Sequence, residues 1–441
     1  MRDLLLIATV VACSVIALRR PVVGLLSFVG FGFLNPQTMT WSMARTFPFA
    51  QLTGMGTILG FLFWSEPKHF PRQRESFLLL ALWVMFGIST AFAIDPESAW
   101  ERFIHVSKIL IMVFLSTALI NTERRLHSFL RVVALTLGFY GIKGGFFAFM
   151  TGGNYIVFGP EDNFIGARNA LGLALTMNIP LLFYFLKHET SPWMRRTFFA
   201  TLVLSYPAII CTYSRGAWLA LGAVTAFLLL RSKHRFAVTA AVAFIGFMLM
   251  PYLPSFVPQR AVERYESLIN YQEEASAQSR FWNWEFCQRV GLAHPFTGGG
   301  FDFYSPEAYA TYFPEFLEHW REKVWSCHSM WYTIFGEHGF PGFLLWLGLM
   351  GSYLLSLRQL RSYGERHAEM SWMVDCANML QAAIIAYMVA GTFLDVAYFD
   401  LFYYLVAVII ILKERIRLMT METFSSVPSP VSITGEKVAV S

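Results

Sequence analysis

Long apolar runs alternate with short polar connections along almost the whole chain. A helix that crosses the hydrocarbon core of a bilayer needs about 17–25 predominantly apolar residues. The runs that approach this length predict membrane-spanning helices at 50–64, 77–94, 103–120, 127–150, 168–187, 197–213, 216–231, 236–257, 330–356, 373–394 and 397–412. Two shorter runs, 3–18 and 21–34, precede them. The pattern therefore predicts an all-α polytopic membrane protein with about 12 transmembrane helices, or about 13 if both short runs cross separately.

Positively charged residues gather in every second connection between these runs. The basic connections contain Lys68/Arg72/Arg74, Arg124/Arg125/Arg131, Lys187/Arg195/Arg196, Arg231/Lys233/Arg235, Arg358/Arg361/Arg366 and Lys413/Arg415/Arg417. The alternate connections are acidic or carry few charges, as at Asp95/Glu97/Glu101, Glu161/Asp162, the turn at Arg215, and Asp395/Asp400. Because Lys and Arg in short loops are retained in the cytoplasm, the basic connections and the C-terminus are expected there. Residues 258–329 and the turn at Arg215 then lie on the outer side.

Composition supports a membrane protein and argues against an ordinary soluble protein or a nucleic-acid-binding protein. Apolar residues make up 56% of the 441 residues and charged residues 14%, against roughly 25% charged in an ordinary soluble domain. The net charge is +5, and no basic cluster alternates with exposed aromatic residues, so no nucleic-acid partner is expected. None of the five cysteines forms a CxxC pair. Cys287 and Cys327 both lie in the outer segment, where an oxidising compartment would allow them to pair.

The long connection 258–329 predicts a separate helical unit outside the membrane. Within it, 259–269 and 279–293 have the pattern of helices, and three consecutive glycines make Pro295–Phe301 a loop. The final stretch, 418–441, is rich in Ser, Pro and Val and is expected to be a disordered tail. The chain therefore divides into N-terminal membrane helices (1–257), this outer unit (258–329), C-terminal membrane helices (330–417) and the tail (418–441).

Two arginines on the outer side are candidates for binding an anion. Arg215 lies in a tight turn between two apolar helices, where a charge is costly without a partner. Arg280 lies at the start of a predicted helix of the outer unit. A guanidinium group stays charged and matches phosphate oxygens in a bidentate manner. On residue type alone, Arg215 also fits a helix anchor that snorkels to the interface, and Arg280 also fits a local salt bridge.

Two histidines and a glutamate are candidates for acid–base chemistry. His328 enters the next membrane helix, and Glu337 and His338 follow further along it. A histidine at the aqueous end of an apolar helix can take a proton from a hydroxyl near neutral pH, although the same position also fits an ordinary interfacial histidine. The two histidines are about 15 Å apart on an ideal helix, too far to share one metal ion. No metal site is therefore expected.

The region around residues 140–170 supplies three further candidates for substrate binding. Lys143 lies inside an apolar helix, and a charged residue there indicates a functional site unless it snorkels to the nearby helix end. Arg168 and Asn169 follow an acidic connection and begin the next helix.

Several of these residues together resemble the signature of bacterial O-antigen ligases. His328-Ser329, followed after nine residues by Gly339-Phe340-Pro341-Gly342, fits the pattern H-[NSQ]-x9-G-x-x-G. Glu337 matches the acidic residue two positions before the first glycine, and His338 fills a normally apolar position. Further matches are the S-R-G-A turn at Ser214-Arg215-Gly216-Ala217 and the R…W…HP..G.G stretch from Ser279-Arg280 through His294-Pro295 to Gly298-Gly299-Gly300.

The N-terminal part is similar to a branch of this family, the O-glycosylation ligases associated with exosortase systems. The similarity is carried by Met1-Arg2-Asp3, Arg19-Arg20-Pro21, Asn35-Pro36 and Phe47-Pro48-Phe49-Ala50.

The resemblance implies a multi-pass glycosyltransferase of the bacterial inner membrane that acts in lipopolysaccharide biosynthesis, with 258–329 in the periplasm. Its donor would be an O-antigen glycan on undecaprenyl diphosphate, its acceptor a sugar hydroxyl of the lipid A core, and its reaction inverting, with no metal or cofactor. Arg215 and Arg280 would bind the diphosphate, His328 would be the base, and Glu337 would orient an arginine or the imidazole. A protein O-oligosaccharyltransferase and an O-antigen polymerase would use the same donor, and a non-enzymatic lipid-glycan transporter is a further alternative.

Overall fold

A computed structural model describes residues 2–231, 275–315 and 324–425, apart from residues 41, 42, 67, 69 and 162. The described part consists of helices and connections and contains no β-strand. Its longer helices are α1 (Arg2–Arg19), α2 (Pro21–Leu34), α3 (Phe49–Leu62), α4 (Arg74–Ala91), α5 (Pro96–Leu119), α6 (Glu123–Met150), α7 (Arg168–His188), α8 (Pro192–Ile210), α9 (Arg215–Arg231), α13 (Ala275–Ala293), α14 (Pro306–Tyr312), α16 (Met330–Arg366), α17 (Trp372–Gly391) and α18 (Asp400–Ser425).

Within the described residues, six helical segments are long and apolar enough to cross a membrane. They are α4, α5, α6, α7, α16 and the segment Ala368–Gly391, which contains α17. The helices α2 and α3 are apolar but shorter. The protein is therefore an all-α, multi-pass membrane protein, while the total of about 12 spans stays a prediction. The expected span 236–257 and the expected helix 259–269 lie outside the described residues.

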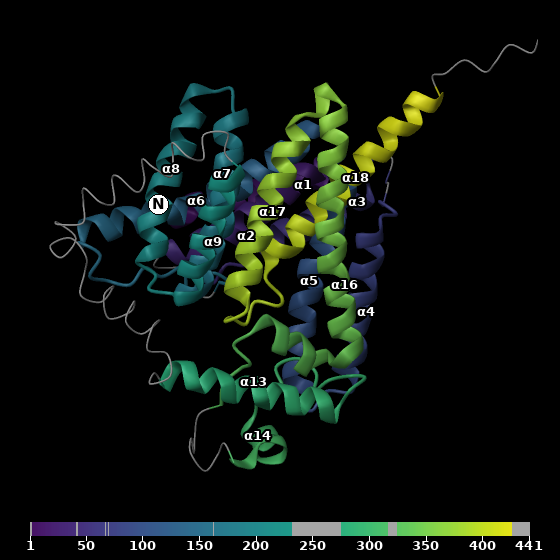
Figure 1. The fold of residues 1–441 in the computed structure, drawn as a ribbon. Coiled ribbons are helices and arrows are strands. Elements are labelled where there is room, and N and C mark those ends of the chain that lie inside the picture. The colour runs from purple at the N-terminus through teal and green to yellow at the C-terminus, as the bar shows by residue number, and fades with distance from the viewer. Residues whose placement is uncertain are drawn as a thin grey trace, which may run out of the picture.

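The helices form one bundle in which α17 and the first half of α18 are central (Figure 1). α17 packs against α7, α9 and α16, and α18 packs against α5. Every residue from Leu401 to Leu412 is buried. An apolar helix that is buried on all sides belongs inside a bundle rather than at its lipid-facing surface. The helix α18 continues to Ser425, past the expected boundary at residue 417, and residues 426–441 are outside the described part.

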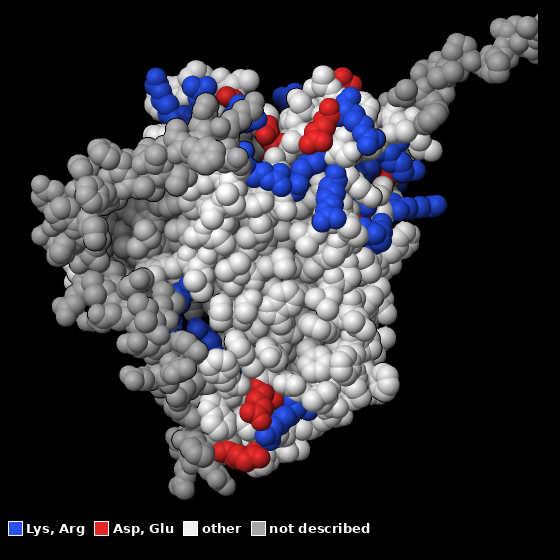
Figure 2. Space-filling view, viewed as in Figure 1, with Lys and Arg blue, Asp and Glu red and all other residues white. Residues whose placement is uncertain are grey.

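The two ends of the bundle differ in charge and in what covers them. α13 and α14 lie across one end, which we call the α13 end (Figure 1). On the face shown in Figure 2, most Lys and Arg side chains gather at the opposite end. This separation is the one that the alternation of basic and acidic connections predicts, because successive connections lie at opposite ends of a bundle.

The helix α16 is not continuous. Gly339 has φ 61° and ψ −164°, so the helix breaks directly after His338 and restarts before Pro341. His328 lies ahead of the helix in a left-handed conformation, with φ 50°. The expectation of a helix that already includes His328 is therefore wrong, because α16 begins at Met330 and the break at Gly339 falls after His338. The separation of about 15 Å between the two histidines stays a prediction.

Candidate active site

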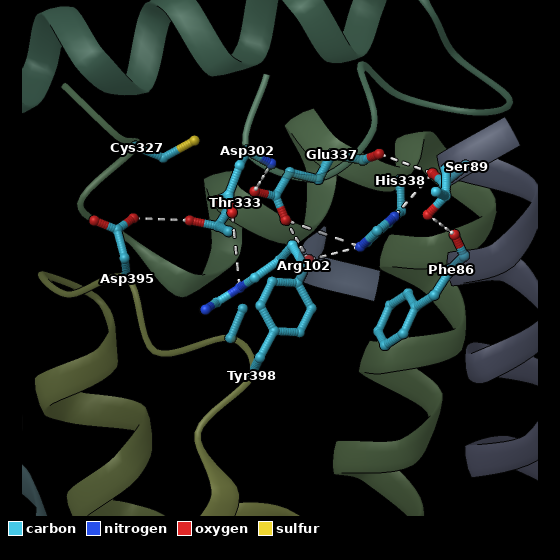
Figure 3. Close-up of polar contacts among 12 residues, drawn as sticks. Phe86, Ser89, Arg102, Asp302, Cys327, Thr333, Glu337, His338, Asp395 and Tyr398 are labelled. Atoms are coloured by element: carbon cyan, nitrogen blue, oxygen red, sulfur yellow. Dashed lines mark hydrogen bonds and ion pairs between the residues drawn. The ribbon is translucent and has the colours of Figure 1, made fainter. Parts of the chain in front are cut away.

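His328 is paired with a carboxylate from a distant connection. Its Nδ1 lies 2.8 Å from Oδ2 of Asp395, which follows α17 in the connection 392–399. The same carboxylate accepts hydrogen bonds from the hydroxyl of Ser326 and, over 3.0 Å, from that of Thr333. Figure 3 shows Asp395 directed at Thr333. Three donors from the segment around the start of α16 thus converge on one carboxylate.

The pairing defines the state of the imidazole ring. A carboxylate can only accept, so Nδ1 of His328 carries a proton, and in the neutral ring Nε2 then presents its lone pair. Burial raises the pKa of a carboxyl group, but the hydrogen bonds from His328, Ser326 and Thr333 hold the pKa of Asp395 below its ordinary value. The His328 side chain is 41% exposed, and within the described residues Nε2 makes no hydrogen bond. This nitrogen is therefore positioned to accept a proton from a bound molecule.

Two arginines lie beside this pair. The guanidinium of Arg280, on α13, lies over the ring of Phe393 at 6.0 Å, two residues before Asp395. Burial and the positive charge of Arg168 lower the pKa of Arg280, and the carboxylate of Asp395 opposes this shift. Arg168 begins α7. Positive charges from two separate elements therefore share one neighbourhood with Asp395, an arrangement suited to an anion with several oxygens.

Arg215 begins α9 at the same end of the bundle. The hydroxyl of Ser214 accepts a hydrogen bond from the amide of Ala217 over 3.4 Å, and so caps the helix. A Cβ at Gly216 would lie 3.5 Å from the carbonyl oxygen of Ala390 and 3.9 Å from Cβ of Phe393, so α9 begins against the end of α17. The S-R-G-A turn therefore brings Arg215, which is only 7% exposed, next to the connection that carries Asp395.

A disulfide fixes the segment that carries His328. Cys287 on α13 is bonded to Cys327, with their Cα atoms 6.0 Å apart. The bond joins the helix of Arg280 to the residue directly before His328. It also confirms that the two outer cysteines, which the sequence allowed to pair, do so, and it is consistent with an oxidising compartment.

Glu337 and His338 belong to a different, buried network (Figure 3). Glu337 is 1% exposed and accepts hydrogen bonds from the hydroxyls of Tyr304 (3.0 Å) and Tyr398. His338 is fully buried, with Nδ1 2.8 Å from the Ser89 hydroxyl and Nε2 2.6 Å from that of Tyr398. Glu337 makes no hydrogen bond with His328 in this structure. The carboxylate that contacts the imidazole of His328 is that of Asp395. The role expected for Glu337, to orient an arginine or the imidazole, stays a prediction.

Glycines of the signature allow a loop to pack closely against the backbone of α16 at Glu337. The amides of Gly299 and Gly300 donate to the carbonyls of Gly336 (2.8 Å) and Glu337 (3.0 Å), which the break in α16 leaves without helical partners. A Cβ at Gly298, whose φ is 66°, would lie 2.3 Å from the backbone of Glu337. The glycine loop therefore inserts into the break, and it needs residues without side chains to come this close.

The remaining sequence candidates lie in different places. Asn169 follows Arg168 in the first turn of α7, where Gly172 packs against Ala217 of α9. Lys143 is exposed on α6, and within the described residues it makes no hydrogen bond or ion pair with the group around His328. The structure thus brings Arg168, Arg215, Arg280 and His328 to one region and leaves Lys143 apart.

Sequence reasoning missed Asp395, Ser326 and Thr333. The signal for Asp395 was present, because it is one of few acidic residues in an outer connection between membrane helices. Its distance of 67 residues from His328 gave no reason to pair the two. Within the described residues, no group of three or more His, Cys, Asp and Glu side chains is arranged to hold a metal ion.

Comparison with protein families gives matches to two parts of the chain. Residues 200–347 match the family model described as O-antigen ligase, and residues 1–190 match a family of unknown function (DUF5935). No curated protein matches the chain. The matched segment, which contains Arg215, Arg280 and His328, is similar to O-antigen ligases, and this supports a glycosyl-transfer role of the ligase or polymerase type. The family implies a lipid-linked glycan and a lipid acceptor in general terms.

Proposed function

We propose that this protein transfers an O-antigen glycan from undecaprenyl diphosphate to a sugar hydroxyl of the lipid A core, on the periplasmic side of the bacterial inner membrane. The observation that carries the proposal is the imidazole of His328, held by Asp395 with Nε2 available and cationic side chains close by. Glycosyl transfer to a hydroxyl needs a base for that hydroxyl and positive charge at the leaving group. The α13 end would then face the periplasm.

In the proposed reaction, Nε2 of His328 takes the proton of the acceptor hydroxyl. The hydroxyl oxygen attacks the anomeric carbon while the bond from this carbon to the diphosphate oxygen breaks, and the electron pair leaves with the diphosphate. Attack opposite to the leaving group inverts the anomeric centre. The Asp395 carboxylate stabilises the imidazolium that forms, as a carboxylate does in a catalytic triad.

The arginines balance the charge of the leaving group. Arg215, Arg280 and Arg168 provide fixed guanidinium groups, which match phosphate oxygens and need no metal ion. Asn169, in the first turn of α7, would contribute an amide for a sugar hydroxyl or a phosphate oxygen. Lys143 would take part only by binding a more distant part of the lipid substrate, because it lies apart from the other candidates.

A gene deletion tests the proposed acceptor. Loss of the long glycan ladder from extracted lipopolysaccharide, with restoration by the wild-type gene and not by a His328→Ala variant, supports transfer to the lipid A core. Loss of glycan from proteins with an unchanged ladder would contradict it and identify a protein ligase. Ladders that shorten to single repeats on a completed core would identify a polymerase.

A further inference from the structure

A cavity of about 540 Å³ lies between α2, α3 and α5, and its lining does not include His328, Arg280 or Asp395. Its walls are largely apolar, with Phe28, Phe31, Phe33, Met55, Ile58 and Met112 among the lining residues. The volume is typical of a site for a small molecule or for part of a lipid. Most of its lining belongs to the segment 1–190, to which the family comparison assigns no function.

Polar side chains line the cavity both towards the α13 end and deeper in the bundle. Asn35 lies just past the end of α2, Gln51 lies in the first turn of α3, and both line the cavity. Asn163, another lining residue, donates to the carbonyl of Gly32 over 2.8 Å and lies five residues before Arg168. Met55 and Ile58 lie further along α3, away from this end. The apolar side chains of this wall suit the hydrocarbon chain of a lipid.

Lys108 is the feature that specifies the headgroup. It lines the cavity and lies six residues beyond Arg102, which approaches Asp302 at 3.9 Å. On a helix this is about 9 Å deeper in the bundle. Within the described residues its exposed side chain makes no hydrogen bond or ion pair. A lysine ammonium at membrane depth is costly without a negative partner, so it marks a ligand site.

Three other titratable side chains line the same cavity, namely those of His105, Asp400 and Tyr404. His105 lies one turn before Lys108 on α5, and Asp400 begins α18. Within the described residues, Asp400 forms no ion pair with Lys108. The charge of Lys108 is therefore available to a ligand.

We propose that this cavity binds a lipid whose headgroup carries a phosphate, with the phosphate at Lys108 and the chain along the phenylalanine wall. The lipid would lie beside the candidate active site, because Phe164 lines the cavity and its ring is 5.1 Å from that of Phe399, four residues after Asp395. A bilayer phospholipid and a polyprenyl phosphate share this chemistry. Binding of either does not depend on the proposed transfer reaction.

Native mass spectrometry of the delipidated full chain tests the proposal directly. Dioleoylphosphatidylglycerol and undecaprenyl phosphate are added separately, and dioleoylglycerol serves as the ligand with the same chains as the first but no phosphate. At least one phosphate lipid should bind the wild type at least about tenfold more tightly than dioleoylglycerol does. Lys108→Met should weaken that binding at least about tenfold, whereas Lys108→Arg should keep most of it. Lys68→Met, an exposed lysine outside the cavity, should match the wild type.

The outcomes separate the sources of the lipid. Preference for phosphatidylglycerol identifies a resident phospholipid, and preference for undecaprenyl phosphate identifies a polyprenyl lipid; either supports the proposal. If neither phosphate lipid binds better than dioleoylglycerol, or if a folded Lys108→Met variant binds like the wild type, the proposal is overturned. Ala50→Phe, which fills the cavity from α3, tests it without altering Lys108 and should weaken binding of the preferred lipid. Unchanged lipid binding in this variant would also overturn it.

Discussion

The carbonyl oxygen of Pro295 occupies the space that a side chain on Gly339 would need. A Cβ at Gly339 would lie 2.5 Å from this oxygen, which also accepts the amide of Phe340 over 2.8 Å. The backbone at Gly339, with φ 61° and ψ −164°, is in a region open essentially to glycine alone. The first glycine of the G-x-x-G signature thus serves to break α16 and to admit the loop from the outer unit.

Gly339→Ala should destabilise the protein. Backbone strain alone is expected to cost about 1–3 kcal/mol, and the contact with Pro295 adds to it. The measurement is the apparent Tm of the purified protein in detergent, which should fall. Gly351→Ala, in the same helix and with no atom within 4 Å of the added Cβ, is the control and should not lower it. Equal Tm values for the two variants would show that the break is not fixed by Gly339.

The bond between Cys287 and Cys327 should contribute to stability because it closes a loop of 40 residues. Cys287→Ala is expected to lower the free energy of unfolding by about 2–4 kcal/mol. A reducing agent should lower the Tm of the wild type and leave that of Cys287→Ala unchanged. Cys13→Ala, which removes a free cysteine, should respond to reduction like the wild type. A wild type whose Tm is insensitive to full reduction would contradict this prediction.

Replacement of the arginines should weaken donor binding. Arg280→Ala and Arg215→Ala each remove a charged hydrogen-bonding group, so binding of the lipid diphosphate should weaken roughly tenfold or more. Arg→Lys should recover only part of the loss, since lysine cannot form the bidentate contact. EDTA should leave transfer active. Correctly inserted Arg→Ala variants with wild-type transfer rates, or an absolute requirement for a divalent metal, would refute the proposed role.

The lowered pKa of Asp395 predicts a dependence of stability on pH. A carboxyl group whose pKa is lower in the folded state stabilises the protein above its unfolded value, about 3.9 for Asp. This contribution is lost as the pH falls through the lower, folded pKa. Asp395→Asn should therefore have a lower Tm than the wild type at pH 7, and the difference should shrink below about pH 4. A difference that is constant with pH would show that the charge of Asp395 is not involved.

The sequence predicts the membrane helices well because their signal is local. Apolar runs at 127–150 and 168–187 correspond to α6 and α7, and the predicted helix 279–293 ends at the same residue as α13. The break in α16 was not predicted, since a glycine in an apolar run is compatible with a continuous helix. It becomes evident only when Pro295 is seen to approach Gly339, which is a tertiary contact.

The candidate site was predicted in part. Recognisable sequence motifs contain Arg215, Arg280 and His328, and the structure brings these residues to one end of the bundle. Asp395 was missed because its contact with His328 depends on how α16 and α17 pack against each other. The spacing of residues along the sequence does not predict this packing. Glu337 lies two residues before the first glycine of the motif, yet the inserted loop buries it with Tyr304 and Tyr398.

The central claim is that His328, held by Asp395, is the base of the reaction, and that His338 is not. The most direct test measures glycan transfer in vitro with purified His328→Ala, Asp395→Asn and His338→Ala, each checked for folding by size-exclusion chromatography and Tm. His328→Ala should lose about 10²-fold or more of the rate and still bind donor, and Asp395→Asn should lower kcat with little change in KM. A folded His338→Ala should retain measurable transfer. An active His328→Ala beside a folded but inactive His338→Ala would contradict the assignment.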